Sequence, residues 1–218
     1  MRIGVIGSGH IGATAARLFA EAGHEVKIAN SRGAAGLEDL ADEFDDDDGI
    51  EAATVEDAAD FGEVVLLAIP LKAYTELPAD ELADTIVIDA TNYYPGRDGQ
   101  IEELDADTVT STELIGRHLY GSRMVKAFNT LAAHTLEDEA GRPAGDHSRL
   151  AMLVAADDDE AKTEVMNLID EIGFDPFETG SLAEGGRVQQ PDSSLYGQEL
   201  TNVQMREALG LHLRGVND

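Results

Sequence analysis

The chain of 218 residues contains no cysteine, only four lysines and no long apolar run. Without cysteine it can form no disulfide, no thiolate nucleophile and no cysteine-ligated metal site. A helix that crosses a bilayer needs about 20 consecutive apolar residues, and no segment approaches that length. The N-terminus carries one arginine and leads directly into an apolar strand, unlike a signal peptide. We therefore expect a cytoplasmic protein that neither spans a membrane nor depends on disulfides.

Basic side chains are scarce. Lys and Arg together number 15 against 44 Asp and Glu, which gives a formal net charge of −29. Such a negative field repels phosphate backbones and anionic lipids, so we expect no nucleic acid and no membrane as partner. The excess of acid with so little lysine favours a halophilic protein, because molar salt shortens the Debye length to about 3 Å and screens self-repulsion. A high-GC genome, which also favours Arg, Ala, Gly and Asp, is the alternative explanation.

The first thirty residues carry the clearest motif. Residues 2–6 form an apolar run typical of a buried parallel strand, followed at once by Gly7-x-Gly9-x-x-Gly12, a helical pattern and a second strand over residues 24–29. In this order the first glycine permits a tight turn, the second lets the backbone approach a pyrophosphate, and the third lets helix and strand pack closely. The segment predicts a βαβ dinucleotide-binding unit.

Strands and helices continue to alternate, which is typical of an α/β protein. Further strands are predicted over residues 64–69, 86–89, 124–128 and 149–155. Further helices are predicted after residue 34, from residue 54, over residues 158–172 and within residues 193–213, with the acidic run 45–48 as a solvated loop. We expect a Rossmann-type, doubly wound parallel sheet in residues 1–147 and a small C-terminal α/β lobe in residues 148–218. The boundary is predicted from the Gly-, Pro- and Asp-rich stretch 141–147.

The residues after the second predicted strand select the dinucleotide. An NAD site needs an acidic residue here to bind the ribose 2′-hydroxyl, but the chain has Asn30, Ser31 and Arg32. Arg32 suits a charge-assisted pair with a 2′-phosphate, and Ser31 and Asn30 add hydrogen-bond donors. The sequence therefore predicts NADP(H) as the cofactor.

Other strand ends should meet the same edge, because the carboxyl ends of parallel strands line one crevice. The residues expected there are Ala68, Ile69, Pro70, Asn92, Ala127, Asn129 and Thr130. The first three should pack on the adenosine or nicotinamide, and the others lie toward the nicotinamide. A loop-capping role is the alternative for Asn129, and Asp89 is expected to cap a strand end.

No catalytic constellation stands out. The histidines show no metal-ligand spacing, so we expect no metal site. His10 lies in the glycine turn and is expected to cover the cofactor, and His134 is placed to reach the pocket from a helix. Hydride transfer depends more on face-to-face stacking of two rings than on an acid-base residue. A 3-hydroxyacid dehydrogenase would need a catalytic lysine on a helix after the dinucleotide-binding half. This class is disfavoured, because the candidate, Lys162, lies in an acidic, exposed helix start.

Five segments span essentially the whole chain: residues 1–12, 30–32, 67–70, 125–130 and 174–182. In this order they resemble one known family, the coenzyme F420-dependent NADP reductases. The resemblance implies a usually dimeric oxidoreductase that exchanges hydride between NADP(H) and a deazaflavin, coenzyme F420, stacked on the nicotinamide. The C-terminal lobe would complete the substrate pocket and form the dimer contact. Together with the charge, the resemblance implies a haloarchaeal member.

The resemblance also implies residue roles. The pyrophosphate contacts would be Ser8, His10 and Ile11, and the 2′-phosphate contacts would be Ser31 and Arg32. The remaining implied contacts are Ile69 and Pro70 beside the adenosine or nicotinamide, and Asn129 and Thr130 near the reacting rings.

Residues 183–191 are longer and more polar than the family's turn, which leaves the acceptor open. Gln189, Gln190 and Tyr196 either shape a different pocket, or the loop lies at a dimer contact. The alternatives in function are an NADPH-dependent flavin or ferric reductase and a non-catalytic NADP(H)-binding redox sensor.

The charge supplies a test of the halophilic interpretation. We expect the melting temperature to rise from dilute buffer to molar KCl, because salt screens the repulsion among the carboxylates. Thermal unfolding followed by circular dichroism at both salt concentrations measures this. A melting temperature that stays level or falls would contradict the interpretation.

Overall fold

The computed structural model describes residues 1–32, 36, 44 and 49–215 of the chain. The strands in this part are β1 (Arg2–Ile6), β2 (Glu25–Ala29), β3 (Ile50–Ala53), β4 (Val64–Leu67), β5 (Ile86–Asp89), β6 (Arg123–Lys126), β7 (Ala151–Ala156) and β8 (Asp175–Gly180). The helices are α1 (His10–Glu21), α3 (Val55–Phe61), α4 (Pro95–Asp98), α5 (Glu102–Asp105), α6 (Ser111–His118), α7 (Ala133–Glu139), α8 (Asp159–Glu171) and α9 (Asn202–Gly215), with 3₁₀ segments η2 (Leu71–Glu76) and η3 (Arg187–Gln189). Most of the helix predicted after residue 34, and the acidic run 45–48, lie outside the described residues.

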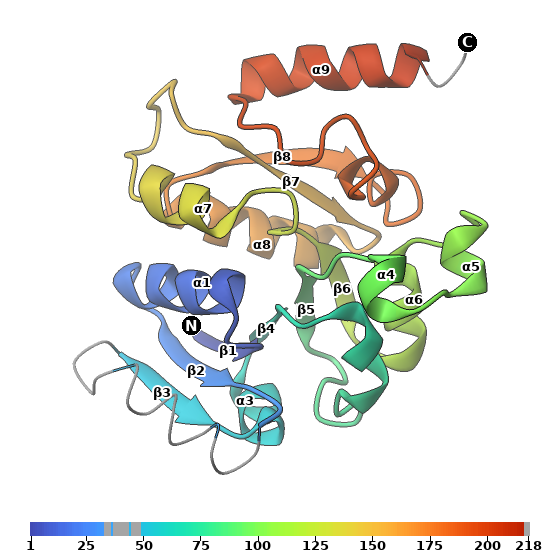
Figure 1. Cartoon of the computed structure of the whole chain (residues 1–218). Helices are drawn as coiled ribbons and strands as arrows, with labels where there is room; N and C mark the ends of the chain where they lie inside the picture. The colour runs from blue at the N-terminus through green and yellow to red at the C-terminus, as the bar shows by residue number, and fades with distance from the viewer. Residues whose placement is uncertain (33–35, 37–43, 45–48, 216–218) are drawn as a thin grey trace.

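A single eight-stranded sheet, in the order β3-β2-β1-β4-β5-β6-β7-β8, runs through the described chain (Figure 1). The first six strands pair in parallel, and the strand order reverses between β1 and β4. β7 pairs antiparallel with β6 and parallel with β8. The doubly wound α/β sheet predicted from the sequence is confirmed. Its consequence is that the carboxyl ends of β1, β2, β4, β5 and β6 meet at one edge.

Helices cover both faces of the sheet, because the strand side chains alternate between the faces. On one face Val5 and Ile28 belong to a core that includes residues of α1, α7 and α8. On the other face Leu67 and Val87 pack in a core with residues of α3, η2 and α6. Burial on both faces explains why the strands are continuous apolar runs in the sequence.

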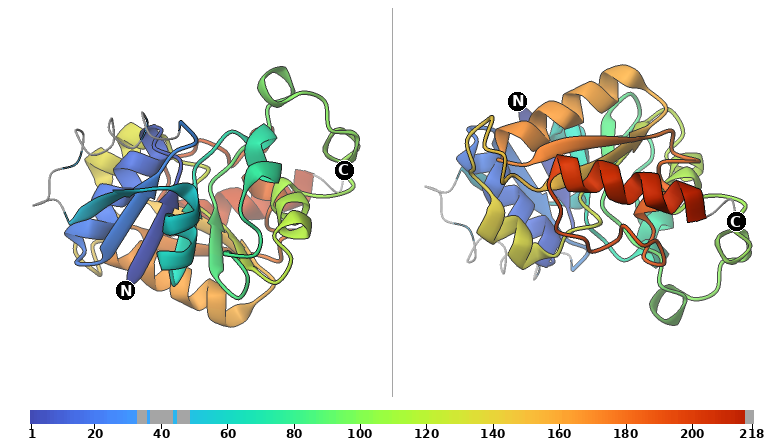
Figure 2. Two further views of the ribbon diagram at one scale, coloured as in Figure 1. Left: turned by 90° about the horizontal axis from the view of Figure 1, so that it is seen from below. Right: turned by 90° about the horizontal axis from the view of Figure 1, so that it is seen from above.

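The C-terminal part adds a third, smaller apolar layer. Leu153 of β7 and Phe177 of β8 pack with Leu195 and with Met205 of α9. In Figure 2, α9 lies across β8, on the opposite side from α8. The predicted boundary at residue 147 falls in the turn before β7, and the division into two units stays a prediction. None of the helices in the described ranges is long and apolar enough to cross a membrane.

Some element ends differ from the predicted ones. The strand predicted over residues 124–128 ends at Lys126, because Phe128 has a φ of 64°, a left-handed conformation that interrupts an extended strand. The strand predicted over residues 64–69 ends at Leu67. The C-terminal helix begins at Asn202, after a bend and turn over residues 193–197 and three residues without regular structure. β3 was not among the predicted strands, since its four residues contain no long apolar run.

Candidate functional site

Glycines at the carboxyl end of β1 bring α1 against the sheet. Gly7 has a φ of 113°, and a Cβ there would lie 2.3 Å from the Ala68 carbonyl oxygen. A Cβ on Gly12 would lie 1.8 Å from the Gly7 carbonyl oxygen. Both clashes are with backbone, so the protein itself requires glycine at these two positions. The contact holds the N-terminus of α1 at the edge of the sheet.

Gly9 differs, because nothing in the described protein requires it to be glycine. It precedes α1 with φ −73° and ψ 179°, which any residue adopts, and a Cβ there would meet no atom within 4 Å. Gly9 offers α1 no side-chain cap, and the first turn of the helix holds no acidic residue. The bare backbone and the helix dipole suit a closely bound phosphate. The residues present therefore fit the pyrophosphate of a dinucleotide.

A pocket lies on each side of this turn. The β2–β4 pocket, about 500 Å³, is lined in part by Gly7, Asn30, Ser31, Ile69 and Pro70. The β5–β6 pocket, about 540 Å³, is lined in part by His10, Ile11, Asn92, Asn129 and His134. The sequence predicted all of these residues for the cofactor or the reacting rings. A dinucleotide that crosses the N-terminus of α1 would have one pocket for each half.

The other predicted residues lie nearby but differ in exposure. Arg32 is exposed at the end of β2, and Ala68 packs behind the glycine turn. Ala127 and Thr130 are buried, so their side chains pack inside the protein. Their contacts with a cofactor stay predictions.

Asn30 organises the segment after β2. Its Nδ2 donates to Ser8 Oγ at 3.2 Å and to the Gly36 carbonyl at 3.3 Å, and its Oδ1 accepts from the Arg32 backbone N–H at 2.9 Å. These bonds engage both ends of the amide. Asn30 thus positions Ser8 and Arg32, and a direct bond from Asn30 to a 2′-phosphate stays a prediction.

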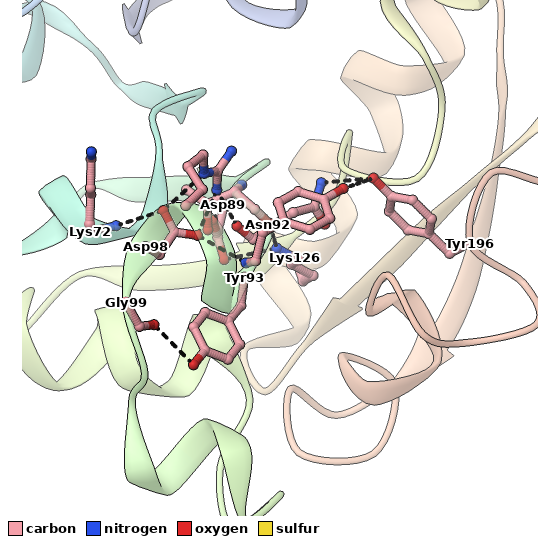
Figure 3. A network of polar contacts seen from close by, with 11 residues as sticks. Lys72, Asp89, Asn92, Tyr93, Asp98, Gly99, Lys126 and Tyr196 are labelled. Atoms are coloured by element: carbon pink, nitrogen blue, oxygen red, sulfur yellow. Dashed lines mark hydrogen bonds and ion pairs between the residues drawn. The ribbon is translucent and has the colours of Figure 1, made fainter.

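A buried ion pair joins the carboxyl ends of β5 and β6 (Figure 3). Lys126 Nζ lies 3.1 Å from Asp89 Oδ2, and the two side chains are 2% and 0% exposed. Lys126 also donates to the Thr91 carbonyl, and the Thr112 hydroxyl donates to the same carboxylate at 2.6 Å. Burial lowers the pKa of Lys126, and Asp89 opposes that shift. Loss of one partner would leave an uncompensated buried charge, which costs about 3–5 kcal/mol.

Asp89 also caps its strand, because its Oδ1 accepts a hydrogen bond from the Thr91 N–H at 2.8 Å. The predicted strand-end cap is therefore confirmed. The sequence did not show the ion pair. Together, Asp89 and Lys126 hold the backbone of Thr91, and the next residue, Asn92, lines the β5–β6 pocket.

Paired amides connect β5 and β6 to the C-terminal segment. Asn129 Nδ2 donates to Asn92 Oδ1 at 3.0 Å and to the Gln189 carbonyl at 2.7 Å. Asn92 Nδ2 donates to the Asn129 carbonyl at 3.1 Å and to Tyr196 Oη at 3.2 Å. Asn129 Oδ1 is buried without a hydrogen-bond partner. Asn129 therefore holds the loop through the Gln189 carbonyl, as the loop-capping alternative expected, and it also lines the β5–β6 pocket.

Two tyrosines complete the network. Tyr196, a further lining residue of the β5–β6 pocket, has its hydroxyl oxygen 2.8 Å from Tyr94 Oη. Burial, and then the hydrogen bond with Tyr94, raise the pKa of Tyr196. Tyr94 lies against Arg97, whose guanidinium carbon is 5.0 Å from the ring centroid and whose Nη2 donates to the Asn92 carbonyl at 2.6 Å.

Asp98 holds this corner together. Burial alone would raise its pKa, but hydrogen bonds from Arg97 and from the Tyr94 and Lys72 backbone N–H groups lower it. Asp98 therefore stays a carboxylate and anchors the segment that follows β5. Figure 3 shows its hydrogen bond from the Lys72 backbone N–H.

Sequence reasoning missed Lys126 and Tyr94. The signal for Lys126 was present, because a lysine inside an apolar strand of a chain with four lysines needs a buried partner. Tyr94 gave no local signal, since its partner Tyr196 lies 102 residues away in the sequence.

The glycine turn, the two flanking pockets and the basic residue after β2 are typical of a Rossmann-type dinucleotide-binding protein. A family profile described as NADP oxidoreductase, coenzyme F420-dependent, matches residues 2–93. The F420-dependent NADP reductase of Methanothermobacter thermautotrophicus is 32% identical over 203 residues, which cover 86% of this chain and 84% of that protein. The chain belongs to this family, as the resemblance implied. A haloarchaeal origin stays a prediction.

Two further proteins resemble the chain. Metalloreductase STEAP3 of Rattus norvegicus is 28% identical over 193 residues, and the match covers 86% of this chain but only 36% of that longer protein. The crystal structure of the hypothetical protein SMa0349 from Sinorhizobium meliloti superposes with a TM-score of 0.74 at 31% identity, covering 92% of this chain and 95% of the other. This crystal structure therefore shares the fold over nearly the full length of both chains.

The glycine turn supplies a matched pair of variants. Gly9→Ala should weaken NADPH binding about tenfold or more, because its methyl group would occupy the open space over the helix N-terminus. Its stability should stay within about 0.5 kcal/mol of the wild type. Gly12→Ala should instead destabilise the fold by about 1–3 kcal/mol, because its Cβ meets the Gly7 carbonyl. Fluorescence titration with NADPH and urea unfolding measure the two effects, and equal NADPH affinity of Gly9→Ala and wild type would contradict the pyrophosphate assignment.

The residue after β2 supplies a second prediction. Arg32→Ala should weaken NADPH binding about 10- to 100-fold, because a charge-assisted pair with the 2′-phosphate is lost. NADH, which has no 2′-phosphate, should bind with nearly unchanged affinity. Isothermal titration with both cofactors tests this, and equal losses for the two would rule out the assignment.

Proposed function

We propose that the protein is an NADP(H)-dependent oxidoreductase that exchanges hydride with coenzyme F420 or a related flavin-like acceptor, a small-molecule redox substrate. The observation that carries the proposal is Gly9: a bare backbone position, unexplained by the protein, between two pockets and at the start of α1. Arg32 in place of an acidic residue supports NADP(H) over NAD(H). Membership in the family, and the 32% identity to an F420-dependent NADP reductase, support a deazaflavin as the acceptor.

Bound NADP(H) would supply the hydride from its nicotinamide. Ser31 and Arg32 would hold the 2′-phosphate, and the N–H groups at the start of α1 would hold the pyrophosphate. In the β5–β6 pocket, Ile11 and Phe128 provide apolar wall, and Asn92 and Asn129 add amide groups. The chain's contribution is to stack two planar rings and exclude water from between them.

A ferric or flavin reductase is the second candidate. The relative named as a metalloreductase supports it, and so does the loop 183–191, whose Gln189 carbonyl bonds Asn129. Gln190 and Pro191 line a third pocket, of about 420 Å³, next to Asn92. A non-catalytic NADP(H)-binding sensor is the third candidate.

The proposal includes a homodimer whose contact is formed by the C-terminal part. The exposed apolar Val203 on α9, 71% accessible, suits such a contact. Sedimentation equilibrium in molar KCl measures the mass of the wild type and of Val203→Asp. We expect a dimer for the wild type and a weakened dimer for Val203→Asp.

An acceptor screen separates the candidates. NADPH oxidation is followed at low and molar salt with coenzyme F420, FMN, FAD and ferric chelates. Turnover with coenzyme F420 is the expected result. Turnover with ferric chelates or flavins alone would favour the second candidate. NADPH binding without turnover of any acceptor would overturn the proposal and favour the sensor.

A further inference from the structure

Reduction by NADPH delivers a hydride, and a flavin-like acceptor must also take up one proton. NADPH, the oxidised acceptor A and one H⁺ become NADP⁺ and AH₂, with the hydride on one acceptor atom and the proton on another. This inference rests on the proposed function. It concerns which group of the chain delivers the proton.

The titratable side chains that line the β5–β6 pocket are His10, His134, Glu137 and Tyr196. The first three are exposed and lie on or beside α1 and α7. Tyr196 is half-buried, and its hydroxyl forms hydrogen bonds with Asn92 and Tyr94, which follow β5. Its position is therefore set by the same edge that would hold the nicotinamide.

A chain of amides orients the Tyr196 hydroxyl. The Gln189 carbonyl accepts from Asn129, so the Asn129 amide must present Nδ2 to it and to Asn92 Oδ1. With Oδ1 thus used as an acceptor, Asn92 presents Nδ2 to Tyr196 Oη at 3.2 Å. An amide NH₂ only donates, so this bond occupies one lone pair of the Tyr196 oxygen.

Tyr94 occupies the second position on the Tyr196 oxygen, at 2.8 Å, and either hydroxyl is able to donate. When Tyr94 donates, both lone pairs of Tyr196 Oη are filled. The proton of Tyr196 then points to neither partner and is available to a ligand in the β5–β6 pocket, which Tyr196 lines. Figure 3 shows Tyr196 reaching toward Asn92 from the C-terminal segment.

Tyr94 connects this hydroxyl to solvent. Its side chain is 38% exposed, and it lines the neighbouring 420 Å³ pocket, not the β5–β6 pocket. The two hydroxyls therefore link the β5–β6 pocket to water on the other side of Asn92.

We propose that Tyr196 is the proton donor of the reaction and that Tyr94 replaces its proton from solvent. In the step, the O–H bond of Tyr196 breaks as a bond from that proton to the acceptor forms. The Tyr94 proton moves to Tyr196, and Tyr94 takes a proton from water. No charge accumulates on either tyrosine.

Single-turnover reduction of the best flavin-like acceptor from the screen tests the relay, in H₂O, D₂O and their mixtures. Tyr196→Phe keeps the ring and should slow the step at least about 100-fold, the range of general acid catalysis, while the Kd for NADPH stays within about twofold. The solvent isotope effect should change as well. Tyr120→Phe is the matched control: Tyr120 is exposed and bonded to Asp80 at 2.7 Å, and its rate should equal that of the wild type.

Tyr94→Phe, at an exposed position, keeps the proposal testable if Tyr196→Phe folds poorly. The wild type should give a curved dependence of rate on deuterium fraction, because two protons move, and Tyr94→Phe should give a line. Wild-type rates in Tyr196→Phe, or a slower rate with an unchanged solvent isotope effect, overturn the relay alone and leave the proposed function. An inactive wild type that binds NADPH, or one that reduces only ferric chelates, overturns the relay together with the F420 proposal.

Discussion

Gly12 lets α1 approach the Gly7 carbonyl so closely that no side chain fits between them, and the rest of the site is arranged around that contact. The N-terminus of α1 is held at the switch between β1 and β4, where the crevice of a doubly wound sheet opens. Gly9 then faces open space at the start of the helix, with a pocket on each side. A helix displaced by one methyl group would move its dipole and its free N–H groups away from this edge.

The far side of the same edge is built from polar side chains buried at strand ends. The pair Lys126–Asp89 joins β5 to β6, and the amides of Asn92 and Asn129 extend the network to the Gln189 carbonyl. Buried polar groups are tolerated only when they are bonded, and such networks become rigid when satisfied. Asn129 Oδ1 is buried without a hydrogen-bond partner in this network. The C-terminal segment takes part in the site through Tyr196, so the pocket depends on residues from both ends of the chain.

The charge has two aspects. In the part of the chain that the structure describes, most carboxylates lie outside the core. Arg149, one of the few cations, is buried: it is 1% exposed and lies 2.8 Å from the Asp170 carboxylate. A buried arginine or lysine is compatible with folding only if it is paired, and an acidic chain has partners in abundance. At the end of β2 the acids are absent, and Arg32 stands where a carboxylate would select NAD.

The sequence by itself determined the doubly wound sheet, the glycine turn and the basic residue after β2, because these depend on apolar periodicity and on glycines at fixed local spacing. Part of the lining of the two pockets was also predictable, since parallel strands end at one edge, but residues such as Thr54, Leu77 and Glu137 were not predicted. Only the tertiary structure decided that Lys126 is buried against Asp89, that Asn30 serves its own loop, and that Tyr196 meets Tyr94 across 102 residues. Such contacts depend on the relative placement of distant segments, and local pattern carries no information about distances between them.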